Sequence, residues 1–109
     1  MSKKHLGEFE HQVLLAVLRL NSDTYSVPIV LELEQRIGRE VGHPAVYIAL
    51  RRLEEKGFVT SELRRPEDNG ARSRRYFTVT KEGVRLLRES RRRFARLWEG
   101  LEPVLEDER

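Results

Sequence analysis

Residues 43–57, with the sequence HPAVYIALRRLEEKG, constrain the fold of this chain more than any other stretch. At the helical repeat of 3.6 residues per turn, Val46, Leu50 and Leu53 share one narrow apolar face. Gly57 stands where a left-handed residue would end the helix. The opposite face is small and cationic and could enter a narrow, negatively charged groove, so we predict that this helix reads DNA. That face carries Ala45, Ile48, Arg52 and Lys56.

Two more helices are predicted before this stretch. Apolar residues recur at helical spacing from Glu8 to Leu20 and cover most of the circumference, so this helix needs covering on more than one side. The cover could come from another helix of the same chain, but we favour a second subunit. The turn at residues 21–24 leads to a second helix, with Ser26 as its N-cap, Pro28 in its first turn and Gly38 at its end. Two short helices joined by a short turn are the helix-turn-helix pattern.

A β-hairpin is predicted directly after the DNA-reading helix. Residues 59–64 and 75–79 each alternate with a period of two, and the stretch between them contains the turn sequence Asn69-Gly70. From Arg64 to Arg75 there are five arginines and two acidic residues, so the hairpin is basic. Such a charge cluster is typical of phosphate binding, although solubility alone would also account for it. A basic hairpin behind a DNA-reading helix is a wing.

A fourth helix is predicted to start after Thr80, which caps it, with Gly83 allowing close backbone packing. A heptad of apolar residues follows, and Pro103 should end or kink the helix. We therefore predict a mainly α fold: a winged helix-turn-helix domain over residues 1–80 and a dimerisation helix with an acidic tail over residues 81–109, together forming one compact unit. The predicted dimerisation residues are Leu14, Leu15, Leu18, Leu87, Phe94, Leu97, Trp98 and Leu101.

Composition excludes several classes of function. The chain has no cysteine, which rules out disulfides, thiolate metal sites and cysteine nucleophiles. Its three histidines, His5, His11 and His43, share no metal-ligand spacing, and no phosphate loop or nucleophile motif is present. We therefore expect no enzyme, metal or cofactor. The amino end is charged and the longest apolar run, residues 13–18, is too short for a bilayer, so we expect a cytoplasmic protein without a membrane partner.

Several motifs together resemble the PadR-like family of winged-helix transcriptional regulators. These are Tyr25-Ser26, residues 44–53 (PAVYIALRRL), 54–59 (EEKGFV), 72–77 (RSRRYF) and 80–83 (TKEG). The chain departs from the family at four positions: Ser26, Ala45, Ala71 and Phe77 stand where relatives usually have glycine, threonine, glycine and tyrosine. The resemblance implies a homodimer built by the first and fourth helices, with two DNA-reading helices in successive major grooves and wings on the flanking backbone. It also implies that some relatives sense small aromatic molecules.

The expected function is that of a sequence-specific repressor that binds an inverted-repeat operator as a homodimer. Trp98 could flank a flat aromatic effector that releases the DNA, or it could simply fill the subunit interface. The alternative is a winged-helix module that binds protein and not DNA. The predicted DNA-binding residues are Ser26, His43, Ala45, Tyr47, Ile48, Arg51, Arg52, Lys56, Arg64, Arg72, Arg74 and Arg75.

Overall fold

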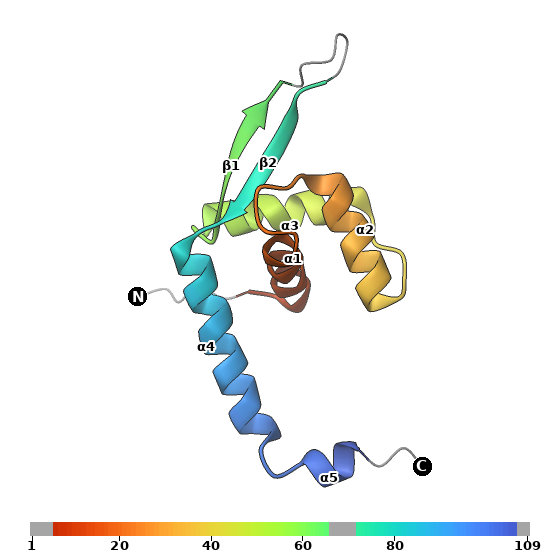
Figure 1. The fold of residues 1–109 in the computed structure, drawn as a ribbon, viewed down its shortest axis with the longest axis vertical. Coiled ribbons are helices and arrows are strands. Elements are labelled where there is room, and N and C mark those ends of the chain that lie inside the picture. Colours follow the sequence, from red (N-terminus) through yellow and green to blue (C-terminus); the bar gives the residue numbers. More distant parts are fainter. Residues whose placement is uncertain (1–5, 66–71, 107–109) are drawn as a thin grey trace.

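The computed structural model describes residues 6–65 and 72–106. Within these residues, three helices are followed by a hairpin, a fourth helix and a short terminal helix (Figure 1). The predicted mainly α fold with a two-stranded antiparallel hairpin is confirmed. The elements are α1 (Glu8–Arg19), α2 (Ser26–Ile37), α3 (His43–Glu55), β1 (Val59–Arg64), β2 (Arg74–Val79), α4 (Lys81–Trp98) and α5 (Glu102–Leu105).

The core lies where α1, α2 and α3 meet the base of the hairpin. The predicted apolar face of α3 is buried, since Val46, Leu50 and Leu53 have no exposed surface. Burying one such side chain contributes about 1.5–3 kcal/mol, so this face fixes how α3 sits on the rest of the molecule. The other side of α3 consequently points outward. Further core residues are Val13, Val17, Ile29, Leu33, Phe58, Val59 and Phe77.

The hairpin pairs β1 with β2 from Val59 opposite Val79 to Arg64 opposite Arg74. A single residue, Thr24, adds to the free edge of β2: its N–H donates to the Phe77 carbonyl over 3.1 Å, and it accepts from the Phe77 N–H over 2.6 Å. The sequence indicates only a turn here, because one paired residue has no periodicity. The predicted turn at residues 69–70 lies outside the described residues.

Helix ends follow the expected chemistry, with one correction. The Thr80 hydroxyl accepts from the Gly83 N–H over 3.0 Å and so caps α4, as predicted. Gly38 and Gly57 both adopt positive φ, 83° and 85°, at the ends of α2 and α3. The prediction of Ser26 as an N-cap is wrong by one residue, because the extended residue is Tyr25 and Ser26 is already helical.

The C-terminal helix is shorter than the heptad predicts. α4 ends at Trp98, and the chain turns through Gly100, whose φ is 85°. Leu101 therefore lies in a turn, beyond the end of the heptad helix. Pro103 lies in the first turn of α5, where its missing N–H costs nothing, so it helps to start a new helix after the bend. Glycine conformation, which a heptad pattern does not register, ends α4.

Two predicted dimerisation residues belong to the core instead. Leu14 has no exposed surface and Leu87 is 8% exposed. Both side chains are covered by the chain itself, because α1 packs against α3 on one side and α4 on another. Leu14 is therefore covered by other helices of the same chain and not by a second subunit. By contrast, Leu15 and Leu18 are 49% and 39% exposed.

α4 leads away from the three-helix body, and α5 lies beyond its far end (Figure 1). The side chains of residues 91–106 are exposed, including Phe94, Leu97, Trp98 and Leu101. Within the described part of the chain, none of the helices has the length and hydropathy that a membrane span requires.

Candidate nucleic-acid interface

The outward face of α3 is the first part of the candidate interface. Tyr47 and Ile48 are 43% and 52% exposed, although both sit on a helix whose other face is fully buried. Arg51 and Arg52 extend the same face toward the end of the helix and are exposed. At the start of α3 the N-cap is Gly42, which has no side chain to bond the first backbone N–H groups. These groups remain suited to an anion such as a phosphate. His43 and Ala45 lie beside them and are exposed.

The end of α3 is tied to α1 by a nearly buried carboxylate. Glu10, with a side chain only 10% exposed, accepts from Lys56 Nζ over 2.7 Å and lies 3.9 Å from Arg52 Nη1. It also accepts from the Gly7 N–H over 3.2 Å. Burial raises the pKa of Glu10, but the bonds from Lys56 and Gly7 and the nearby cations outweigh it and hold that pKa below its ordinary value. Lys56 thus anchors α3, a role that the sequence pattern did not reveal.

A second chain of polar contacts joins α3 to the wing. The Glu54 carboxylate lies 3.4 Å from Arg51 and accepts from the Ser61 hydroxyl over 2.7 Å. Ser61 in turn accepts from Arg75 Nη1 over 2.9 Å. Arg75 is therefore turned toward α3 and half-buried, and its predicted DNA contact would have to be made alongside this bond. The contacts fix the angle between α3 and the hairpin.

The other face of the hairpin carries a stacked cluster of arginines and tyrosines. Arg64 lies over the Tyr76 ring at 4.4 Å, and Arg74 lies over the Tyr25 ring at 4.7 Å. The two rings are 5.3 Å apart and tilted by 53°. Tyr25 precedes α2 directly, so the start of the helix-turn-helix is packed against the wing. Cation–π stacking of this kind restricts both guanidinium groups without neutralising their charge.

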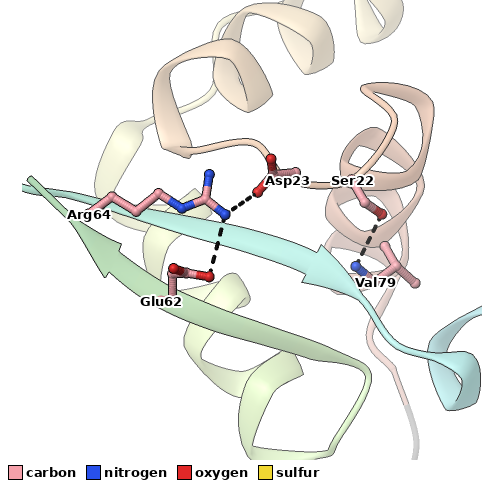
Figure 2. Close-up of polar contacts among 5 residues, drawn as sticks. All are labelled: Ser22, Asp23, Glu62, Arg64 and Val79. Carbon is pink, nitrogen blue, oxygen red and sulfur yellow. Dashed lines mark hydrogen bonds and ion pairs between the residues drawn. The ribbon is translucent and has the colours of Figure 1, made fainter. Parts of the chain in front are cut away.

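Arg64 is also paired with two carboxylates (Figure 2). Its Nη2 lies 2.6 Å from Asp23 Oδ1 and 3.4 Å from Glu62 Oε1. The bonds from Asp23 and then Glu62 raise the pKa of the guanidinium above its already high ordinary value. Close by, the Val79 N–H donates to the Ser22 hydroxyl over 3.2 Å, which holds the same turn against β2.

These contacts change the charge distribution expected from the sequence. Asp23 and Glu62 lie beside Arg64, so this face of the wing is less cationic than its arginines alone suggest. Arg74, which pairs with Arg64 across the hairpin, and Arg72 are exposed. Sequence reasoning missed the acidic partners because Asp23 is 41 residues from Arg64, and Glu10 is 46 residues from Lys56. The sequence contains only a weak signal for the stacked cluster: Tyr25 follows the turn at residues 21–24, and Tyr76 follows Arg74 and Arg75.

Among the residues that the structure describes, no group of three histidine, aspartate or glutamate side chains lies close enough together to hold a metal ion. His11 lies on α1 and lines the groove next to α4. Burial, and to a smaller extent the charge of Arg93, lowers its pKa. His43 is exposed at the start of α3. Ser26 is half-buried in the first turn of α2.

Three core helices, an exposed helix face and a hairpin that follows it define a winged helix-turn-helix protein. The Transcriptional regulator PadR-like family matches residues 14–89. A PadR family transcriptional regulator from Eggerthella lenta DSM 2243 is 31% identical, with 86% of this chain and 80% of that chain covered and a TM-score of 0.68. The chain therefore belongs to the PadR-like family of transcriptional regulators, as its motifs predict.

Two more distant structures share the fold. A PadR-like transcriptional regulator from Bacillus cereus strain ATCC 14579 is 17% identical, with 92% of this chain and 93% of that chain covered and a TM-score of 0.69. F93 from STIV, a winged-helix DNA-binding protein, is 13% identical, with 89% of this chain and 98% of that chain covered and a TM-score of 0.69. No curated protein matches the chain.

Proposed function

We propose that this protein is a repressor that binds an inverted-repeat operator as a homodimer in the cytoplasm and has no catalytic role. The observation that carries the proposal is the exposed face of α3, fixed next to a wing that bears Arg72 and Arg74. In this proposal residues 1–80 form the DNA-binding domain, and residues 81–109, together with the exposed leucines of α1, pair the two subunits.

The outer face of α3 has the size and chemistry to read a major groove. The groove is about 12 Å wide and admits an α-helix. Arg51 and Arg52 can donate two hydrogen bonds each to a guanine edge, and the Ile48 side chain can contact a thymine methyl group. Tyr47 can pack its ring on the protein and donate its hydroxyl to a phosphate. Ala45 offers only a methyl group near the start of α3.

The wing and the helix ends would hold the DNA backbone. Arg72 and Arg74 are the proposed phosphate contacts, together with the uncapped N-terminus of α3. Arg64 and Arg75 are proposed as weaker contacts, because each is already bonded within the protein. Lys56 acts mainly by holding the end of α3 to Glu10.

The homodimer would use the apolar surface that one chain leaves exposed. Leu15, Leu18, Phe94, Leu97 and Trp98 are each at least 39% exposed. Two copies paired through this surface would present two α3 helices, about 34–36 Å apart if the geometry is that of helix-turn-helix dimers. A flat aromatic effector between the two Trp98 rings would release the operator only if it binds the non-productive dimer geometry more tightly.

Selection of bound fragments from a pool of random duplexes tests the proposal, because it returns the motif, its symmetry and its spacing together. We expect an inverted repeat with half-sites one helical turn apart. If the dimer contacts about 6–10 phosphates, its affinity should fall about 10³–10⁵-fold between 50 and 200 mM salt. A flat salt response, or no preferred motif, would refute the proposal.

A paired variant separates DNA binding from protein binding. Arg72→Ala with Arg74→Ala should reduce the slope of log affinity against log salt by about 0.9 for each lost phosphate contact. Arg36→Ala, on an exposed arginine of α2 that faces Glu32, is the control and should leave the slope unchanged. If the wing variant binds its partner as well as the parent protein does, the module binds protein instead.

A further inference from the structure

Arg64 and Arg74 lie directly opposite each other on the hairpin, but their surroundings differ. Like charges at opposed positions destabilise a pair of strands. Asp23 and Glu62 reduce this repulsion because they pair with Arg64, at 2.6 and 3.4 Å. Within the described residues no carboxylate pairs with Arg74, which is exposed. Of the two opposed arginines, Arg74 therefore keeps its charge for an external anion.

The contact that holds Arg74 is the ring of Tyr25. The guanidinium carbon lies 4.7 Å from the centre of that ring. The ring is itself half-buried and packs on Tyr76, 5.3 Å away. An aromatic face attracts a cation but accepts none of the hydrogen bonds that a guanidinium directs into its own plane. The N–H groups of Arg74 consequently remain available to phosphate oxygens.

The backbone before Tyr25 is strained and held against the wing. Residues 21–23 have φ of 66°, 55° and 59°, although none of them is glycine. Three successive left-handed residues store strain that surrounding contacts must maintain. The Ser22 hydroxyl accepts from the Val79 N–H (Figure 2), and Thr24, only 6% exposed, pairs with β2. The turn thus fixes the point from which the Tyr25 ring extends over the hairpin.

We propose that Tyr25 is a positioning residue for Arg74. Its ring holds the guanidinium of Arg74 in the orientation in which that group meets a DNA phosphate. Because the side chain is ordered before binding, less rotamer freedom is lost when the complex forms. The inference rests on the phosphate contact proposed above for Arg74 and adds the residue that orients it.

A double-mutant cycle on DNA affinity tests the coupling between the two residues. The duplex of highest affinity from the selection described above is titrated by fluorescence anisotropy. Tyr25→Leu should weaken binding about three- to tenfold, which corresponds to the free energy of one cation–π contact. In an Arg74→Ala background the same change should have no effect, because the group that Tyr25 positions is gone.

Arg72→Ala provides a matched background. Arg72 is a second exposed arginine of the wing and stacks on no ring within the described part of the chain. Tyr25→Leu should keep its full effect there. Equal effects of Tyr25→Leu in the Arg72→Ala and Arg74→Ala backgrounds overturn the inference.

Two readouts distinguish positioning from a direct contact of Tyr25 with DNA. Tyr25→Phe keeps the ring and should bind like the parent protein, whereas a loss as large as that of Tyr25→Leu would assign the contact to the hydroxyl and overturn the inference. The slope of log affinity against log salt should be unchanged in Tyr25→Leu, since Arg74 still reaches its phosphate. In Arg74→Ala it should fall by about 0.9 for each lost contact.

The contact is also measurable in the free protein. The Tyr25 ring current should shift the Hδ protons of Arg74 upfield in the NMR spectrum, and Tyr25→Phe should retain the shift. Ordinary positions of these signals in the parent protein overturn the inference, whether or not Tyr25→Leu folds.

The outcomes separate the inference from the proposed function. If Arg74→Ala weakens DNA binding but Tyr25→Leu does not, the positioning role is wrong and the regulator remains. If Arg74→Ala leaves both the affinity and the salt slope unchanged, the proposed phosphate contact fails and the inference fails with it.

Discussion

Replacement of Glu10 by glutamine should destabilise the fold through the end of α3. The change keeps the size of the side chain and its bond to Gly7 but removes the charge that faces Lys56 at 2.7 Å and Arg52 at 3.9 Å. Breaking a fully buried ion pair costs about 3–5 kcal/mol, and an exposed pair contributes about 0–1 kcal/mol. The Lys56 side chain is 30% exposed, so we expect a loss of about 1–2 kcal/mol for Glu10→Gln.

The pH dependence of this loss identifies its cause. The pKa of Glu10 in the folded protein lies below its ordinary value of 4.5, so its contribution is present above pH 4.5 and disappears as the pH falls through the folded-state pKa. The melting temperatures of parent and variant should therefore differ near neutral pH and converge in acid. At about 4–8 °C per kcal/mol, the neutral difference is easily measured by circular dichroism at fixed protein concentration.

A matched control makes the result decisive. Glu55→Gln removes the same charge from an exposed side chain at the end of α3 and should change the melting temperature little. If Glu10→Gln lowers the melting temperature equally at neutral and acidic pH, the loss comes from packing and the ion-pair reasoning is refuted. No loss at neutral pH would refute it as well.

Further substitutions probe other parts of the molecule. Gly83→Ala should cost about 1–3 kcal/mol in urea unfolding, because a Cβ there would overlap the backbone carbonyl of Phe58 and the side chain of Val79; a neutral result would disprove the close packing. Leu14→Ala should cost about 2–5 kcal/mol of unfolding free energy, whereas Leu15→Ala should weaken dimerisation and leave a folded chain, as sedimentation and unfolding together would show. Asp23→Asn combined with Glu62→Gln should remove both carboxylate partners of Arg64, free it for a phosphate and increase the salt slope of DNA binding by about 0.9 per subunit; an unchanged slope in gel-shift titrations would restrict Arg64 to a structural role.

Much of the fold follows from local patterns in the sequence. The apolar spacing of Val46, Leu50 and Leu53 predicts both α3 and its buried side, and the period-two runs predict β1 and β2. The caps at Thr80 and Gly57 were predicted because they depend on one or two residues. The heptad overestimated the length of α4. The repeat of apolar residues continues past Gly100, but the helical backbone ends at Trp98.

The candidate site was predicted less completely. The arginines and the outward face of α3 are visible in the sequence as charge and periodicity. Their partners are not: Asp23 reaches Arg64 across 41 residues, and Ser61 links Glu54 to Arg75 through the packing of the wing. Which arginines are already bonded within the protein, and which are exposed to a ligand, depends on these contacts.

The order of helices and strands, their buried sides and the family follow from local sequence patterns, because periodicity, capping and motif spacing are properties of neighbouring residues. Tertiary structure alone decided that Leu14 lies in the core and Leu15 on the surface, and that Lys56 holds α3 to Glu10. The physical reason is that burial and ion pairing depend on which elements meet, and no pattern within one helix specifies what packs against it.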